Sequence, residues 1–476
     1  MADNVQLNLG TGGDSLGADD ISGVKYQRVK MIHGADGVND GDVSSANPMP
    51  IEIFGTSDGG VPIGIKARDE GHLEVAITGP KTAFGEVQVA QMTPVSQVDF
   101  VYGLNSETTN TTNTGIGSAS ASGALLTVQT GANTNSSSQV VTRRSAKYRP
   151  GQGVNGRFTA LYTTGAANSK QYAGLFDEDF DEGFGFGYNG TAFGIVSIKG
   201  GTETWVDQTV WSVDTMDGDA DVANPSGVTL DPTKGNVFMI QFQYLGFGAI
   251  RFLVENPTTG EFQLVHTIEF ANANTETSLN NPTVRIGWRA ENTSNGTNIQ
   301  VKAASGALFI EGLQRLLGPQ HSSANSKASI TTETSVIALR NATTYNTVDN
   351  EADVHLRSIS FGANSGGSTT GIAFLRIVLN PTIGGTPSYS PVSGSTSDNG
   401  VTITSGESVV SVDTAGTTVT GGIVIYSSVI AVGTTSGKID LTDADIVLDP
   451  GDVAAISIES TQAVTAGVGV NWSEDI

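Results

Sequence analysis

Two acidic clusters are the residues whose type and spacing could best hold a metal ion. Asp177 and Asp179 lie directly before a Gly/Phe-rich strand, and Asp217, Asp219 and Asp221 alternate in a later loop. Clustered carboxylates together with loop carbonyls suit a hard cation such as Ca²⁺. Neither cluster matches the full twelve-residue EF-hand loop, so the alternative is two solvated loops with no cofactor. Calcium at these five aspartates is the only metal hypothesis that the sequence supports.

Paired carboxylates also serve glycoside hydrolases, one as acid and the other as base or nucleophile. Within 177–182 only alternate members can converge, because adjacent strand residues point to opposite faces. The five histidines are far apart, and no Gly-Lys-Ser or Gly-Lys-Thr of a phosphate-binding loop occurs. We therefore expect a protein that is not an enzyme and has no catalytic residues, with a glycosidase as a minor alternative.

The overall charge excludes a second class of function. The chain has 24 Lys and Arg against 48 Asp and Glu, for a net charge of −24. A nucleic-acid-binding protein must neutralise phosphates with clustered cations, so no nucleic-acid partner is expected. The absence of cysteine rules out disulfides, thiol nucleophiles and cysteine-ligated zinc.

One short segment is strongly basic. Arg143, Arg144, Lys147 and Arg149 form the largest cluster of positive charge in this acidic chain. Such a cluster attracts an acidic surface. That surface belongs either to this chain or to a neighbouring subunit, so these four residues are candidates for an inter-subunit contact.

The first 53 residues predict an extended arm that cannot bury a core of its own. Within it, apolar and basic residues alternate at period two over 24–31, as in a strand, and a Pro-rich stretch closes the segment. Polar terminal segments of this kind often become ordered against a partner. The predicted anchoring residues are Val24, Tyr26, Arg28, Val29, Lys30, Asn47, Pro48 and Pro50.

The remainder predicts an all-β protein with two antiparallel β-sandwiches of the jelly-roll or lectin-like type. Short apolar strands are separated by Gly, Asn, Asp and Pro, and glycine makes up 60 of 476 residues. Aromatic residues at 184–188 and 242–247 could form a sugar-stacking platform, although strand spacing favours a place in the core. The expected divisions are an arm at 1–53, a short-strand connector at 54–97, a central sandwich at 98–316, a linker at 317–327 and a C-terminal sandwich at 328–476.

The start of the chain has no basic and apolar signal-peptide pattern, and no stretch is apolar enough to span a bilayer. We therefore expect synthesis in the cytoplasm of the producing cell and no membrane insertion.

Several segments resemble virion structural proteins of tailed bacteriophages, of the head decoration, head fibre or tail fibre type. The similar segments are 18–30, 34–37, 46–50, 148–153, 187–194, 225–227, 231–236 and 468–476. The resemblance implies a non-enzymatic protein of the virion, made in the host cytoplasm, with other capsid or tail proteins as partners. It also implies a homo-oligomer, for which we expect a trimer. The alternative is a tail fibre or adhesin module that binds a receptor or a host-surface glycan.

Overall fold

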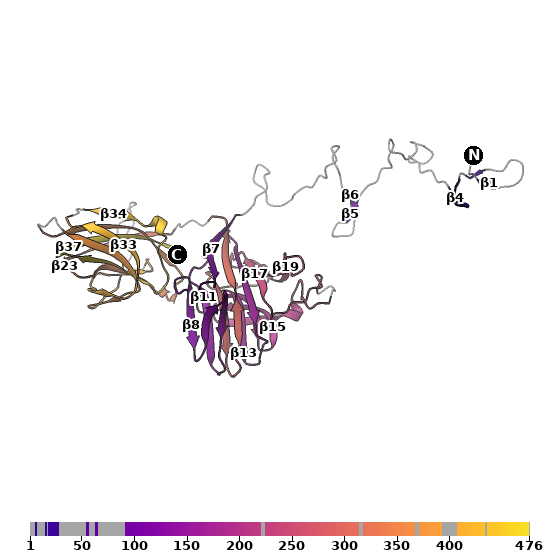
Figure 1. Cartoon of the computed structure of the whole chain (residues 1–476), viewed down its shortest axis with the longest axis horizontal. Coiled ribbons are helices and arrows are strands. Elements are labelled where there is room, and N and C mark those ends of the chain that lie inside the picture. The colour runs from indigo at the N-terminus through magenta and orange to yellow at the C-terminus, as the bar shows by residue number, and fades with distance from the viewer. Residues whose placement is uncertain are drawn as a thin grey trace. The chain divides into compact units, whose positions relative to one another are not determined.

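We describe a computed structural model of the chain (Figure 1). The structure describes residues 5–6, 15–16, 18–27, 54–56, 62–64, 91–219, 224–313, 318–366, 371–392, 407–433 and 436–475. The chain divides into two units, Met1–Val89 and Ala90–Ile476. The described part of the first unit consists of short antiparallel hairpins: β1 (Val5–Gln6) with β2 (Ser15–Leu16), β3 (Ala18–Ile21) with β4 (Val24–Gln27), and β5 (Phe54–Thr56) with β6 (Pro62–Gly64).

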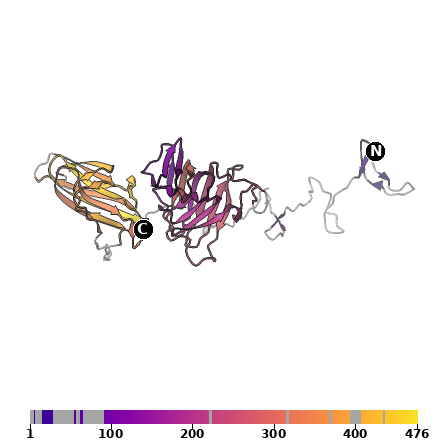
Figure 2. The same cartoon turned by 90° about the horizontal axis from the view of Figure 1, so that it is seen from below.

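The first part of the second unit is a sandwich of two antiparallel sheets (Figures 1 and 2). Its nine-stranded sheet has the order β19 (Phe262–Ile268), β18 (Ile250–Glu255), β17 (Asn236–Phe242), β12 (Val154–Tyr162), β21 (Gln300–Ala303), β10 (Leu125–Gln129) and β9 (Ser118–Ser122), and β22 (Ser305–Glu311) pairs with β12 and with β7 (Met92–Asp99). Its seven-stranded sheet has the order β16 (Thr202–Asp207), β15 (Ala192–Lys199), β14 (Gly183–Asn189), β13 (Ser169–Phe176), β20 (Arg285–Asn292), β11 (Ser136–Thr142) and β8 (Thr109–Thr114).

Strand β14 shows how the sequence builds this core. Phe184 and Phe186 point inward and are fully buried, whereas the alternating glycines face the other side of the sheet. The outward side needs these glycines, because the ring of Phe176 lies over Gly185, where a Cβ would come within 2.6 Å of Cζ. Phe184, Phe186 and Phe242 of the predicted stacking platform therefore belong to the core, as the strand spacing favoured, whereas Phe247 is exposed.

The second sandwich follows in the same unit and has an aliphatic core with one fully buried tryptophan, Trp472. Its five-stranded sheet has the order β23 (Gln320–Ile330), β37 (Val464–Asp475), β27 (Asp353–Asn364) and β34 (Gly437–Asp440), with β35 (Val447–Leu448) also on β27. Its six-stranded sheet has the order β30 (Ser390–Pro391), β31 (Val410–Asp413), β24 (Thr334–Asn341), β36 (Val453–Ser460), β28 (Ile372–Leu379) and β33 (Ile423–Ala431). Two small hairpins complete it: β25 (Thr344–Tyr345) with β26 (Val348–Asp349), and β29 (Thr382–Ile383) with β32 (Val419–Thr420).

The all-β fold with β-sandwich domains is thus as expected. The described residues contain only two short 3-10 helices besides strands, Gln208–Val210 and Thr442–Ala444. In the part of the chain that the structure describes, no helix has the length and hydropathy needed to traverse a bilayer.

Two of the expected boundaries need correction. The linker placed at 317–327 is largely strand, because Gln320–Ile330 forms β23 and pairs with β37 along most of its length. Its polar residues suit an edge strand, whose outer side faces water. The central sandwich begins before residue 98, since β7 starts at Met92 and pairs with β22.

Candidate functional site

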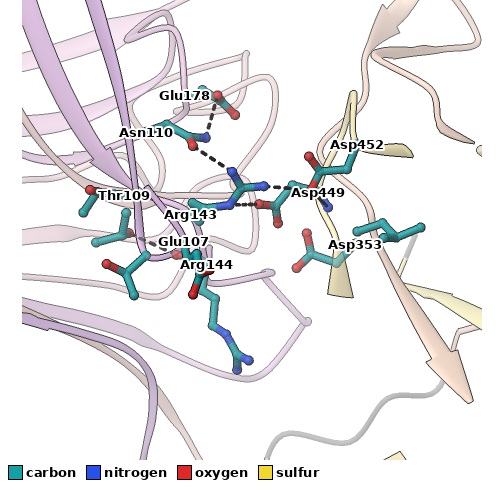
Figure 3. A network of polar contacts seen from close by, with 12 residues as sticks. Glu107, Thr109, Asn110, Arg143, Arg144, Glu178, Asp353, Asp449 and Asp452 are labelled. Carbon is teal, nitrogen blue, oxygen red and sulfur yellow. Dashed lines mark hydrogen bonds and ion pairs between the residues drawn. The ribbon is translucent and has the colours of Figure 1, made fainter. Parts of the chain in front are cut away.

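The basic segment after β11 meets the C-terminal sandwich of the same chain. Each of its four cations forms an ion pair there, so their charges find partners without a neighbouring subunit. Figure 3 shows Arg143 between Asn110 on one side and two aspartates on the other. The pairs are Arg143 Nε with Asp449 Oδ2 (2.8 Å) and Nη2 with Asp452 Oδ2 (2.7 Å), Arg144 Nη2 with Asp445 Oδ2 (2.7 Å), Lys147 Nζ with Asp353 Oδ1 (3.4 Å), and Arg149 with Asp475.

Local structure gathers the opposing carboxylates at one end of the second sandwich. Asp353 begins β27 and lies opposite Asp475 at the end of β37. Asp449 and Asp452 lie in the turn that follows β35, where the Asp449 backbone N–H donates to Asp452 Oδ2 (3.1 Å). Strand ends and one tight turn therefore present several acids on a single surface.

Arg285, the first residue of β20, is the most deeply buried cation of this region, with its side chain 1% exposed. Its Nη2 lies 3.0 Å from Glu351 Oε2 and 3.6 Å from Glu178 Oε2, and its Nη1 donates to the carbonyl of Arg143. We call these five cations and their seven carboxylates the charged joint; the carboxylates are Glu178, Glu351, Asp353, Asp445, Asp449, Asp452 and Asp475. Arg285 escaped the sequence reasoning, although a lone arginine in the apolar run 284–288 is itself a signal of a buried ion pair.

Burial dominates the electrostatics of the charged joint. It raises the pKa of Asp449 to about 6, and the charge of Asp353 adds to the rise against the opposing charge of Arg143. Burial likewise raises the pKa of Glu351, which Arg285 opposes. For Arg285, burial alone lowers the pKa, but Glu351 and the other acids outweigh it and the net direction is upward. Two acids of the joint, Asp449 and Glu351, thus have raised pKa values, and the pKa values of Arg143 and Arg285 are raised as well.

Two of the predicted calcium ligands, Asp177 and Asp217, accept hydrogen bonds from backbone N–H groups in local turns. Asp177 Oδ1 accepts from the backbone N–H of Asp181 (2.8 Å), and burial raises the Asp177 pKa to about 7. Asp217 Oδ1 accepts from the N–H of Asp219 (3.0 Å). Burial also raises the pKa of Asp179. Asp221 lies outside the described residues, and among those described no group of three or more His, Cys, Asp or Glu is placed to hold a metal ion.

Of the predicted anchoring residues, only Val24 and Tyr26 fall in the described part of the chain. Both lie on β4 and are about half exposed, at 54% and 53%. The first half of the strand predicted at 24–31 is thus present. Arg28, Val29, Lys30, Asn47, Pro48 and Pro50 lie outside the described residues.

A Gly-x-Ser-x-Gly sequence, which can mark a nucleophilic serine, occurs at 13–17 and at 55–59. In the first, Ser15 lies in strand β2, not in the strand-to-helix turn that exposes a nucleophile. In the second, Ser57 lies outside the described residues. Neither match supplies an active-site geometry.

The outer face of the nine-stranded sheet carries a different kind of arginine. Arg157 on β12 is exposed, and its guanidinium carbon lies 5.7 Å from the ring centre of Phe262 and 5.6 Å from that of Phe309. Among the described residues no carboxylate lies within ion-pair distance of it. Arg157 is thus held by aromatic rings while its N–H groups remain open to a ligand.

Two hollows with polar side chains are found along this sheet, and the first is lined by this arginine. One of about 300 Å³ is lined by Arg157 together with Gln97, Asp99, Thr159 and Ser305. The other, of about 290 Å³, is lined by Gln241, Gln243, Arg251 and Glu311. Strand register explains the second, because Gln241 lies opposite Arg251 on β18. We call Arg157, Phe262, Phe309 and the polar residues of both hollows the Arg157 face; sequence reasoning missed it, since its residues come from six strands and from the loop after β17.

No family model matches the chain, and no curated protein matches it. Among solved structures, the carbohydrate recognition domain of Emp47p aligns over 47% of this chain and 97% of its own, with 11% identity and a TM-score of 0.29. Arcelin-5, a lectin-like defense protein from Phaseolus vulgaris, covers 46% and 99%, with 10% identity and a TM-score of 0.29. The exoplasmic/lumenal domain of VIP36, in a Ca²⁺/Man3GlcNAc-bound form, covers 48% and 93%, with 7% identity and a TM-score of 0.29. At such TM-scores these similarities carry no argument about what the chain does.

Proposed function

We propose that the chain is a non-enzymatic protein that binds carbohydrate on the Arg157 face of the central sandwich. The observation that carries this proposal is the exposed Arg157 between Phe262 and Phe309, with no carboxylate of the described residues at ion-pair distance. Sugar rings present hydroxyl groups at their edges and C–H groups on their faces. Planar hydrogen-bond donors and acceptors bind the hydroxyl groups, and aromatic rings pack on the C–H faces.

The polar side chains around Arg157 support the same ligand class. Gln97, Gln241 and Gln243 supply amide donors and acceptors, and Asp99 and Glu311 supply acceptors. Both hollows are shallow and lie along one sheet, which suits an extended chain of sugar units better than a small enclosed molecule. No step of bond cleavage is assigned to this face.

Binding to polysaccharides and to a glycan array tests this proposal. Arg157→Ala removes the central donor, so we expect at least a tenfold loss of affinity, equivalent to about 1.4 kcal/mol. Arg340→Ala is the matched control, because Arg340 is also exposed and lies 4.3 Å from the ring centre of Tyr389, but on the other sandwich. No binding to any glycan by the unaltered chain, or equal losses in both variants, would contradict the proposal.

A second candidate function, a structural component of a tailed-bacteriophage virion, rests on the sequence resemblance given above. The charged joint supports it, since ion pairs between the two sandwiches suit a part that projects from a particle. In this proposal residues 1–89 anchor the chain to capsid or tail proteins, and the protein assembles as a trimer.

Particle incorporation tests the second candidate. The full chain and a chain lacking residues 1–89 are compared for incorporation into phage particles that lack the protein, with electron microscopy to locate it. We expect loss of incorporation without the arm, and a trimeric mass in analytical ultracentrifugation of the full chain. Normal occupancy by the shortened chain would refute the anchoring role.

A further inference from the structure

One ion pair of the charged joint differs from the others in its hydrogen bonding. Lys147 Nζ lies 3.4 Å from Asp353 Oδ1, with the two side chains 8% and 12% exposed. Each of these two atoms is buried without a hydrogen-bond partner. By contrast, Arg143 in the same joint makes short, well-directed hydrogen bonds to its aspartate partner. An amine and a carboxyl group are therefore held together, each with a buried polar atom that no hydrogen bond satisfies.

Further acids surround this pair. Asp353 lies opposite Asp475 in the strand register and two residues after Glu351. Glu351 is itself largely buried, and the charges of both Lys147 and Asp353 act on it. A second acid thus accompanies the amine and the carboxyl group.

We propose that Lys147 and Asp353 condense to an amide bond that covalently joins the two sandwiches, with Glu351 transferring the proton. A proton passes from the Lys147 ammonium group to the Asp353 carboxylate, the freed Nζ attacks Cγ, and a C–N bond forms. Glu351 accepts a proton from Nζ and delivers one to the departing oxygen, so that the C–O bond breaks and one water leaves. The lysine and aspartate together lose one water, and no oxidant, reductant or cofactor takes part.

The geometry supports both the approach of the amine to the carboxyl group and the departure of the released water. Lys147 Nζ lies 3.4 Å from Oδ1, which is bonded to the Cγ that the amine attacks, so the two groups already lie side by side. A cavity of about 250 Å³ is lined by Lys147 and Glu351 together with Tyr345 and Asn350, and it offers the released water a place beside the new bond. Because the chain has no cysteine, it has no disulfide with which to tie the two sandwiches together.

Intact mass spectrometry of the denatured full chain tests the proposal. We expect a mass lower than that of the sequence by one water, and a branched proteolytic peptide that contains both Lys147 and Asp353. Lys147→Arg and Asp353→Ala should both show their full sequence mass, because a guanidinium and a methyl group cannot form this bond. Asp353→Asn should react with loss of ammonia and reach the same final mass as the unaltered chain.

Controls separate the reaction from folding. Lys170→Arg is the matched control, since Lys170 Nζ lies 2.8 Å from Glu203 with a normal hydrogen bond and greater exposure. It should keep the loss of one water. Glu351→Gln should fold, as judged by circular dichroism, yet remain unlinked. An unaltered chain with its full sequence mass, or a branched peptide from another lysine, would overturn the proposal and leave an ordinary buried ion pair.

Discussion

Arginine has opposite environments in the charged joint and on the Arg157 face. In the joint, Arg285 is buried and bound by carboxylates from two directions. On the face, Arg157 is exposed and touched by two aromatic rings. In a chain with twice as many acidic as basic residues, an arginine without an acid is the less expected case. The comparison teaches that buried, paired cations report on how the fold is held, whereas the exposed Arg157 is the one to which we assign a binding role.

Removing the buried member of the joint should give the largest effect. Arg285→Ala leaves Glu351 without its closest cation, and breaking a buried pair from one side costs about 3–5 kcal/mol. We expect a loss of this size in the free energy of unfolding, measured by denaturant titration with fluorescence detection. A loss below about 1 kcal/mol would mean that water reaches the site and that the joint is not a buried one.

The pH dependence of stability should give an intermediate effect. The pKa of Asp177 is about 7 in the folded chain, above its ordinary value, so the folded state binds more protons than the unfolded state between about pH 4 and 7. The Asp177 carboxyl group therefore lowers the free energy of unfolding as pH rises through 7. In acid, where this group is protonated in both states, it causes no such loss. Asp177→Asn keeps an oxygen acceptor for the Asp181 N–H and removes the charge. It should be more stable than the unaltered chain at pH 8 by on the order of 1–3 kcal/mol, and equal to it near pH 4.

Comparing the unaltered chain with the Asp177→Asn variant across pH 4–8 separates the effect of the Asp177 carboxyl group from that of other titrating residues. Burial lowers the pKa of His266 and of His355, and these groups act in the opposite sense. Both histidines are present in both proteins and cancel in the difference. A difference in stability that does not change with pH would show that Asp177 is ionised in the folded chain at all these values.

Exposed arginines should give the smallest effects on stability. Arg144 and Asp445 are 56% and 49% exposed, and such pairs contribute about 0–1 kcal/mol. Arg157→Ala should change the free energy of unfolding by about 0.5 kcal/mol or less, although in our proposal it weakens glycan binding. A large destabilisation by Arg157→Ala in thermal unfolding would make this residue a structural one and erase the contrast between the two regions.

The all-β fold followed from local signals, and the charged joint only in part. Period-two alternation in β14 reveals the inward Phe and outward Gly without knowledge of any neighbour. The basic segment 143–149 also stood out, because cations are scarce in this chain. Its partners could not be identified, since Asp353 and Asp449 are two hundred or more residues away and resemble any other aspartate in the sequence.

The Arg157 face and strand β23 were missed for a related reason. Arg157, Phe262 and Phe309 come from three strands, and only the pairing of the sheet brings them together. Strand β23 is a run of Ser, Asn, Lys and Ala that lacks apolar alternation and resembles a linker. It becomes a strand because β37 offers it a row of hydrogen-bonding groups.

Strand β7 gives the molecule a mechanical property. Everything that precedes Met92 is connected to the sandwiches through β7, which lies antiparallel to β22. Its only paired neighbour among the described strands is β22. A pull along the axis of β7 strains the hydrogen bonds of this ladder together rather than one after another. Resistance to such a pull is set by the rate at which this ladder opens, not by the equilibrium stability of the two cores.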